Sequence, residues 1–266
     1  MLWRFPAVGP LADNAAHMTP HSCPLRWRPA MAGALCAGVL LGCAAPAPTP
    51  RGEAKAAPAT TGELAQSDVN RMATLAMREN LDGLYRLMDK LYRRNPAEWR
   101  KGPAAGREQA LEQVREAVER RQPWPALQGR RDIAALAFAL SPEFAGDRVA
   151  AFIHATADMV IAAHGGKTEF FLIDSLDAQY LYNAARNVEI AAWVLAQRRT
   201  AAGRPLLLAD EISERERNLS FEREFGKIIG RLDLLSAVAA EKYRRAAISY
   251  VQGIMGGSFL QFLPVR

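Results

Sequence analysis

The chain has few of the residues from which disulfide bonds and metal sites are built. None of its three cysteines lies beyond Cys43, and after that position only His154 and His164 carry an imidazole. A domain that begins after Cys43 therefore cannot form an internal disulfide bond. On one helix the two histidines would lie about 15 Å apart along the axis, too far to share a metal ion. The sequence predicts no metal site and no cofactor.

The signature motifs of the common enzyme classes are also missing. The chain contains no His-Glu-x-x-His, no Gly-x-Ser-x-Gly and no paired-cysteine motif. Gly165-Gly166-Lys167-Thr168 looks like the end of a phosphate-binding loop, but the first glycine of that motif would fall on Ile161. We interpret this segment as a glycine helix stop. No catalytic residue is predicted.

The excess of positive charge is small for a chain of 266 residues. Lys and Arg number 34 against 28 Asp and Glu, a net charge of +6. Without the first 42 residues, 31 basic residues would oppose 27 acidic ones, an excess of +4. So small an excess does not indicate a nucleic-acid partner. Half of the residues are hydrophobic, which suits one large folded domain.

A short hydrophobic segment follows basic residues near the start of the chain. The apolar run from Ala30 to Leu41 ends at Gly42-Cys43. This order is typical of a secretory signal peptide, because so short a run does not cross ~30 Å of hydrocarbon permanently. An uncleaved anchor helix is the alternative. A true start at Met18 would remove the first residues of an unusually long leader.

The junction Leu40-Leu41-Gly42-Cys43 resembles the lipobox of bacterial lipoproteins, with a branched apolar residue at minus three and a small one at minus one. The resemblance covers only the first 43 residues. It implies that residues 1–42 are a signal peptide cleaved before Cys43, and that Cys43 carries a diacylglycerol and usually an acylated amino group, commonly with palmitate. Cys36 fits the box poorly, because Leu35 stands at minus one.

The residues after the lipobox bear on location. Ala44 stands where an aspartate would favour retention on the inner membrane, so the resemblance implies the periplasmic face of the outer membrane. Several acyl chains would make the membrane a stable partner, since each buried methylene contributes about 0.8 kcal/mol. Residues 43–66 are rich in Ala and Pro, and we expect a lipidated, disordered tether that reaches up to roughly 70 Å.

Helical periodicity begins after the tether and continues through the chain. Helix caps, glycines and prolines divide residues 67–266 into six expected helices. Their approximate ranges are 67–95, 105–121, 131–140, 147–164, 174–199 and 220 onward. The apolar runs 170–173 and 205–209 fit either strands or core packing. The sequence predicts a mainly α fold, an irregular multi-helix bundle with a long C-terminal helix.

The C-terminal helix carries an apolar seam with alternating spacings of four and three, which is typical of a helix packed along a partner. The seam consists of Phe221, Phe225, Ile228, Leu232, Leu235 and Ala239, and Lys242 interrupts it. Gly226 and Gly230 lie four residues apart on one face. We expect them to allow another helix to approach closely.

One polar cluster interrupts a helix that otherwise looks buried. Within the segment 177–193, four polar side chains fall on one face of the helix. They are Tyr180, Asn183, Arg186 and Asn187. If this face lies inside the domain, the side chains must bond either to one another or to a ligand. Both a structural network and a ligand site remain open.

The sequence favours a lipid-anchored periplasmic protein of the cell envelope that acts as a binding or adaptor module. The alternative is a small-ligand receptor or an enzyme with its site around 177–193. Basic doublets at Arg93-Arg94, Arg120-Arg121 and Arg198-Arg199 fit an anionic partner such as peptidoglycan, although cations are also favourable in a last helical turn. An envelope protein or peptidoglycan is the expected partner.

Overall fold

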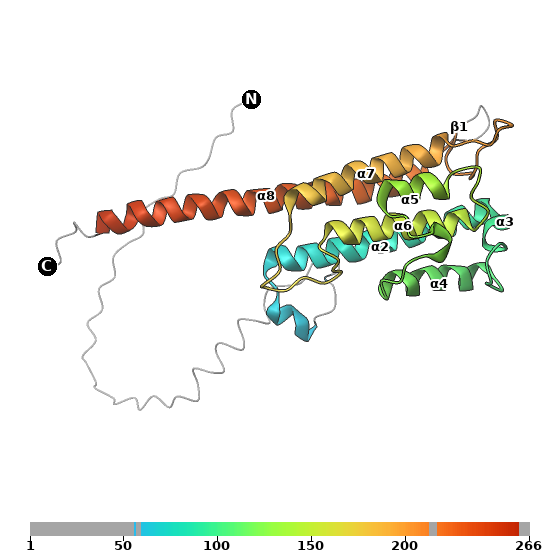
Figure 1. The fold of residues 1–266 in the computed structure, drawn as a ribbon. Helices are drawn as coiled ribbons and strands as arrows, with labels where there is room; N and C mark the ends of the chain where they lie inside the picture. Colours follow the sequence, from blue (N-terminus) through green and yellow to red (C-terminus); the bar gives the residue numbers. More distant parts are fainter. Residues whose placement is uncertain (1–55, 57–59, 213–216, 261–266) are drawn as a thin grey trace, which may run out of the picture. The chain divides into compact units, whose positions relative to one another are not determined.

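The computed structural model describes Ala56, residues 60–212 and residues 217–260. The expected signal peptide, Cys43 and most of the tether lie outside the described residues. In the described part the fold is mainly α, as the sequence predicts (Figure 1). The α-helices are α2 (Asp68–Arg94), α3 (Pro96–Trp99), α4 (Arg107–Glu119), α5 (Asp132–Ala139), α6 (Arg148–Ala163), α7 (Ala178–Gln197) and α8 (Ser220–Leu260).

Short elements complete the described chain. The 3₁₀ helix η1 (Thr61–Ala65) precedes α2 and η2 (Pro125–Leu127) precedes α5. Between α7 and α8, β1 (Glu211–Ile212) pairs antiparallel with β2 (Arg217–Asn218). The backbone N–H of Leu172 donates to the carbonyl of Ala65 at 2.8 Å, which ties η1 to the loop before α7. Part of the segment expected to be tether is therefore packed against the bundle.

Local capping signals set the ends of two long helices. Ser67 Oγ accepts a hydrogen bond from the backbone N–H of Asn70 at 3.3 Å, and α2 begins there. Asp147 Oδ1 accepts from the N–H of Ala150 at 3.0 Å and starts α6. Gly165 and Gly166 both adopt positive φ just after α6. They terminate the helix as expected, because glycine reaches this conformation without steric cost.

Helix α6 runs through the centre of the bundle. Along its length most residues are buried, and it packs against α2, α4, α5 and α7. Helix α8 packs along α7 and α2 and runs antiparallel to both. At one end Lys90 of α2 donates to the carbonyl of Ser220 at 3.3 Å, and further along Arg231 pairs with Glu79 at 3.4 Å.

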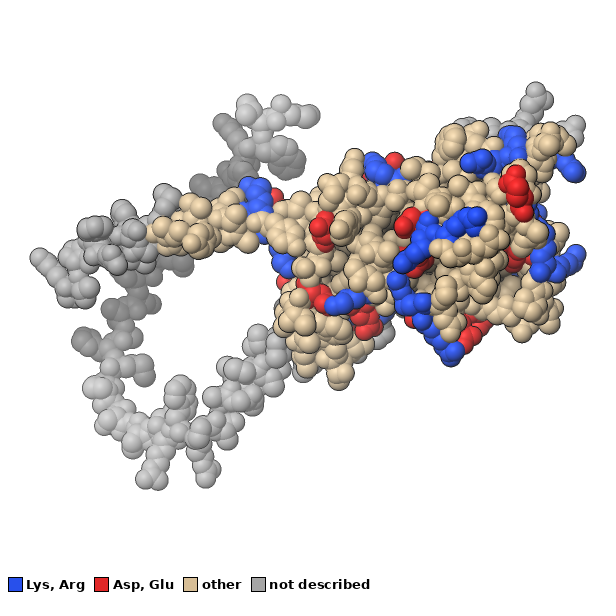
Figure 2. Space-filling model, in the orientation of Figure 1, with Lys and Arg blue, Asp and Glu red and all other residues tan. Residues whose placement is uncertain are grey.

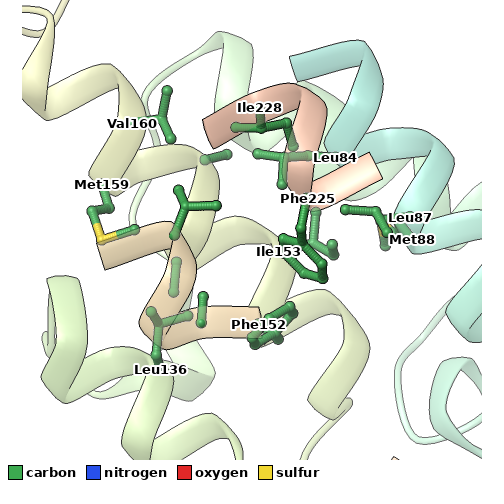
Figure 3. Close-up of a cluster of buried hydrophobic side chains, with 14 of the residues drawn as sticks. Leu84, Leu87, Met88, Leu136, Phe152, Ile153, Met159, Val160, Phe225 and Ile228 are labelled. Carbon is green, nitrogen blue, oxygen red and sulfur yellow. The ribbon is translucent and has the colours of Figure 1, made fainter. Parts of the chain in front are cut away.

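The six seam residues of α8 are all buried, as the spacing predicts. Phe225 packs edge-to-face on Phe152 of α6, with ring centroids 6.4 Å apart (Figure 3). Leu84 of α2 and Ile153 of α6 lie close by in the same cluster. The main core therefore joins α2, α6 and α8.

Beyond the seam, α8 continues past the ends of α2 and α7 (Figure 1). From Lys242 to Ile254 every residue is exposed. In Figure 2 the projecting part shows basic side chains near its base and an uncharged surface beyond them. Among the described residues, no helix combines the length and hydropathy needed to cross a membrane.

The two ambiguous apolar runs are not strands. In the first, Phe170 is buried, whereas Leu172 and Ile173 are 62% and 95% exposed. In the second, Leu207 is buried and Leu208 is half exposed. Helix α7 also begins later than expected, because Asp177 caps it by accepting from two backbone N–H groups. Each run therefore contributes a single large buried side chain to the core, Phe170 in the first and Leu207 in the second.

Close helix approach occurs at a different glycine from the two that the sequence suggested. A Cβ atom at Gly226 or Gly230 would meet nothing within 4 Å, so that expectation is wrong. Gly83 of α2 instead lies against Ile228, whose side chain would be 3.4 Å from an added Cβ. Gly83 is therefore the position where α2 and α8 approach most closely among these glycines.

We expect Gly226→Ala to raise the free energy of unfolding by about 0.5–1 kcal/mol, because alanine is the better helix former and the site has space. Gly83→Val should lower it by about 1–3 kcal/mol through crowding against Ile228. Urea unfolding followed by circular dichroism measures both. Equal changes in the two variants would contradict the assignment of Gly83 as the contact glycine.

Candidate functional site

The polar cluster on α7 lies on the surface of the domain. Tyr180 is 60% exposed, Asn183 is exposed, and Arg186 and Asn187 are half-buried. The Nε2 of Gln179 donates to Asn183 Oδ1 at 2.9 Å, within the same helix. The face is not inside the domain, so a buried hydrogen-bond network does not form there.

Arg186 is the one member of this cluster that links two helices. Its Nη2 lies 2.8 Å from Asp233 Oδ2 on α8 and 3.0 Å from Glu189 Oε1 on α7. The guanidinium also lies over the ring of Tyr182, 5.0 Å from the centroid. The pair with Asp233 links α7 to α8, whereas the other two contacts lie within α7. The two cavities described next are lined by other residues.

A cleft of about 270 Å³ opens where the segment between α4 and α5 crosses α6. We call it the α6 cleft. Its charged and aromatic lining includes Arg121, Trp124 and Arg131 from the segment, and His154 and Asp158 from α6. These residues are far apart in the sequence, and α6 brings them together by running beneath the segment.

Two guanidinium groups converge on one carboxylate in the α6 cleft. Asp158 Oδ2 accepts from Arg131 Nε at 3.1 Å and Nη2 at 2.9 Å, and Arg121 Nη2 lies 3.5 Å from Asp158 Oδ1. All three side chains are at least partly exposed, so each pair alone contributes little to stability. The three groups together carry one net positive charge. An incoming carboxylate or phosphate would find two donors already held in position.

The backbone of the same segment adopts an unusual conformation. Among the described residues, the non-glycine positions with positive φ are Arg121 at 56°, Gln128 at 54° and Asp132 at 51°. All three border or line the α6 cleft. Each costs roughly 1–2 kcal/mol relative to an ordinary backbone conformation. Such conformations concentrate at ligand sites, and this clustering marks the cleft as a candidate site.

His154 forms the buried wall of the α6 cleft. Its Nε2 donates to the carbonyl of Gln122 at 2.9 Å, and its ring lies 5.6 Å from that of Trp124. Burial lowers the pKa of His154, although the Gln122 carbonyl opposes this shift. The imidazole is therefore neutral at pH 7, with Nδ1 buried and without a hydrogen-bond partner. It shapes the cleft and supports Trp124 without adding charge.

Trp124 separates the α6 cleft from a second cavity of about 330 Å³. This cavity is more apolar, and its walls include Tyr92, Trp99 and Asp147. Tyr92 donates its hydroxyl to Asp147 Oδ2 at 2.6 Å. Burial raises the pKa of both groups, and the carboxylate of Asp147 raises that of Tyr92 further. A ligand with an anionic group next to an apolar group would match the two cavities.

The sequence analysis did not predict the α6 cleft, although the spacing of two of its lining residues could have pointed to it. His154 and Asp158 lie one turn apart on α6, and they face the same cleft. Asp158 is engaged by arginines, and the described residues contain no group of three or more potential metal ligands. The doublet Arg120-Arg121 is divided: Arg120 pairs with Glu116 at 2.8 Å within α4, whereas Arg121 reaches the cleft. Arg93 likewise pairs with Asp89 at 2.8 Å on its own helix.

His164 closes α6 as a neutral donor. Its Nδ1 donates to the carbonyl of Val160 at 2.8 Å, and the ring packs near Phe170. Burial lowers the pKa of His164, because the charged form would lose its hydration. The side chain therefore satisfies a free carbonyl at the helix end and does not act there as a cation.

This burial predicts a pH-dependent stability. Below about pH 6.5 the unfolded chain protonates at His164 more readily than the folded chain, so the free energy of unfolding should fall by up to about 1.4 kcal/mol per pH unit from this residue. In His164→Gln, which keeps a donor, the fall should be smaller. Urea unfolding at about pH 7.5 and about pH 5.5 measures both. Identical pH dependence in the two proteins would contradict it.

Comparisons with known proteins assign no family to the chain. No protein-family model matches it, and no curated protein and no solved structure does so either. The functional interpretation therefore depends on the residues themselves.

Proposed function

We propose that the chain is a bacterial lipoprotein whose helical domain works at the cell envelope as a binding or adaptor module. The observation that carries the proposal is the junction Leu40-Leu41-Gly42-Cys43, preceded by a basic and then an apolar segment. In this proposal residues 1–42 are removed and Cys43 is acylated. Ala44 favours the periplasmic face of the outer membrane.

The binding role is supported by the α6 cleft. Arg121 and Arg131 present donors around a single carboxylate, and Trp124 offers an aromatic surface beside them. Planar guanidinium groups bind carboxylates through paired hydrogen bonds. A partner that carries carboxylates therefore fits best, either peptidoglycan or an acidic segment of an envelope protein.

The lipid anchor is tested by metabolic labelling with palmitate. Wild-type protein should incorporate the label, and mass spectrometry should find Cys43 as its acylated first residue. Cys43→Ser should lose the label entirely, since the thiol is the attachment point. Cys36→Ser, seven residues earlier in the same leader, is the matched control, and it should stay labelled. Equal labelling of Cys43→Ser and wild type would refute the anchor.

The binding role is tested by cross-linking in cells and by co-sedimentation with purified peptidoglycan sacculi. Wild type should be recovered with at least one of them. Arg121→Gln/Arg131→Gln should weaken recovery by about tenfold or more, because each charge-assisted pair contributes about 1.5–3 kcal/mol. Arg223→Gln, an exposed arginine on α8, is the control. Unchanged recovery of the double variant would show that the α6 cleft is not the binding site.

A further inference from the structure

The last part of α8 extends beyond the bundle, and its residues from Lys242 to Ile254 are exposed. The seam ends at Ala239, and one turn later the hydroxyl of Tyr243 donates to the carbonyl of Leu176 at 3.3 Å. From there α8 continues to Leu260. We call residues 242–260 the projecting segment (Figure 1).

The projecting segment has an unusual composition for a helix exposed to water. From Ala246 to Leu260 it contains no charged residue. Large apolar side chains are exposed along it: Ile248 at 40%, Tyr250 at 73%, Val251 at 52% and Ile254 at 56%. Exposed helices of soluble domains ordinarily carry a charged face. Figure 2 shows that the described surface beyond the basic residues is uncharged on the face in view.

The segment is also a weak helix former by itself. Gly253, Gly256 and Gly257 lie within it, and a Cβ at Gly253 would meet nothing within 4 Å. Glycine is a poor helix former, and here packing within the domain does not compensate. An apolar surrounding would stabilise the helix, because the backbone must then satisfy its hydrogen bonds internally. Its glycines and its lack of charge thus favour the same environment.

The projecting segment leaves the domain at the end where the chain enters it. Val69 and Asn70, at the start of α2, line one small cavity together with Ala239 and Tyr243 of α8. The opposite ends of the two helices meet at Lys90 and Ser220. Residues 44–59 could extend about 50 Å at 3.1 Å per residue. A bilayer that holds Cys43 would therefore lie within reach of the projecting segment.

Cations lie at the base of the projecting segment. Lys242, Arg244 and Arg245 follow one another closely there, and Arg244 pairs with Glu241. Basic residues next to an apolar helix are attracted to anionic headgroups, and tyrosine is favoured at the interface between water and lipid. This charge pattern complements an anionic lipid surface. A coiled-coil partner would instead call for charged residues beside the apolar stripe.

We propose that the projecting segment inserts shallowly into the bilayer to which Cys43 is anchored, as a second membrane contact. This inference rests on the proposed lipid anchor, which supplies the bilayer. The uncharged helix from Ala246 to Leu260 is about 22 Å long, shorter than the ~30 Å hydrocarbon layer, so it enters one leaflet and does not cross. The contact would hold the α6 cleft at a fixed height above the membrane.

Vesicle flotation of residues 43–266 carrying Cys43→Ser tests the second contact, because this protein has neither the apolar leader nor the acylated thiol, and so neither of them can bind it to the vesicles. It should float with vesicles of phosphatidylethanolamine and phosphatidylglycerol. Tyr250→Asp/Ile254→Asp should lower the bound fraction about tenfold or more, since two carboxylates would enter the interface. Trp193→Asp/Leu234→Asp is the matched control, at apolar positions 62% and 61% exposed on the bundle. It should float like its parent, and circular dichroism should show that both variants are folded.

Two results would overturn the inference. One is failure of the Cys43→Ser chain to float, including the case in which sedimentation shows a dimer that Tyr250→Asp/Ile254→Asp disrupts, because a second copy would then cover the segment. The other is equal flotation of parent and variant. Neither result bears on the palmitate labelling of Cys43, which is measured separately. The proposed lipid anchor and the proposed second contact can therefore be refuted independently.

Discussion

Phe225→Ala is expected to lower the free energy of unfolding by about 3–5 kcal/mol. Phe225 is 1% exposed, and it stands where α2, α6 and α8 meet, with its ring edge-to-face on Phe152 (Figure 3). Alanine would remove the buried ring area and leave a cavity that the surrounding helices fill only in part. Urea unfolding followed by circular dichroism measures the loss.

Leu234→Ala is the matched control for this prediction. Leu234 lies on the same helix and is 61% exposed, so its truncation should change the free energy of unfolding by less than about 0.5 kcal/mol. A comparable loss in both variants would contradict the prediction, because the loss would then not come from the buried ring of Phe225.

The fold was predictable wherever its signals are local. The spacing of the α8 seam identifies the buried face because helical geometry alone places those side chains on one side. Ser67 and Asp147 mark helix starts because their side chains bond the N–H three residues on. These signals depend on neighbours in sequence, and the structure confirms them.

Other features depended on contacts that sequence spacing does not contain. Asp174 stood at the start of the expected helix 174–199, but its carboxylate accepts from Lys167 and from the backbone N–H of Phe171, so it stabilises a turn before α7. The contact glycine is Gly83 because α8 happens to place Ile228 against it. Glycines on a single helix do not show which helix faces them.

The candidate site was missed for the same reason. Residues around Trp124 and residues on α6 meet only because α6 passes beneath the segment between α4 and α5. The polar residues of α7 drew attention since they interrupt an apolar pattern, yet Tyr180 and Asn183 face solvent. A polar face on a half-buried helix is ordinary, whereas the positive φ values near the cleft are visible only in the structure.

Asp147→Ala should cost about 2–4 kcal/mol of unfolding free energy, more than a lost helix cap alone. Asp147 caps α6 through Oδ1 and accepts the hydroxyl of Tyr92 through Oδ2. Loss of the cap accounts for about 0.5–2 kcal/mol. Tyr92 is 1% exposed, and its hydroxyl, left buried without a partner, adds about 1–3 kcal/mol.

Two comparisons separate these contributions in urea unfolding. Ser67→Ala removes a cap that accepts no second side chain, so it should show the capping loss alone. Asp147→Asn keeps an acceptor for Ala150 and a polar partner for Tyr92, and it should lose less than Asp147→Ala. Because burial raises the pKa of Asp147, the neutral amide also avoids a desolvated charge. If Ser67→Ala and Asp147→Ala lower the free energy of unfolding by the same amount, the hydrogen bond to Tyr92 contributes nothing to stability. Packing alone would then hold this wall of the second cavity.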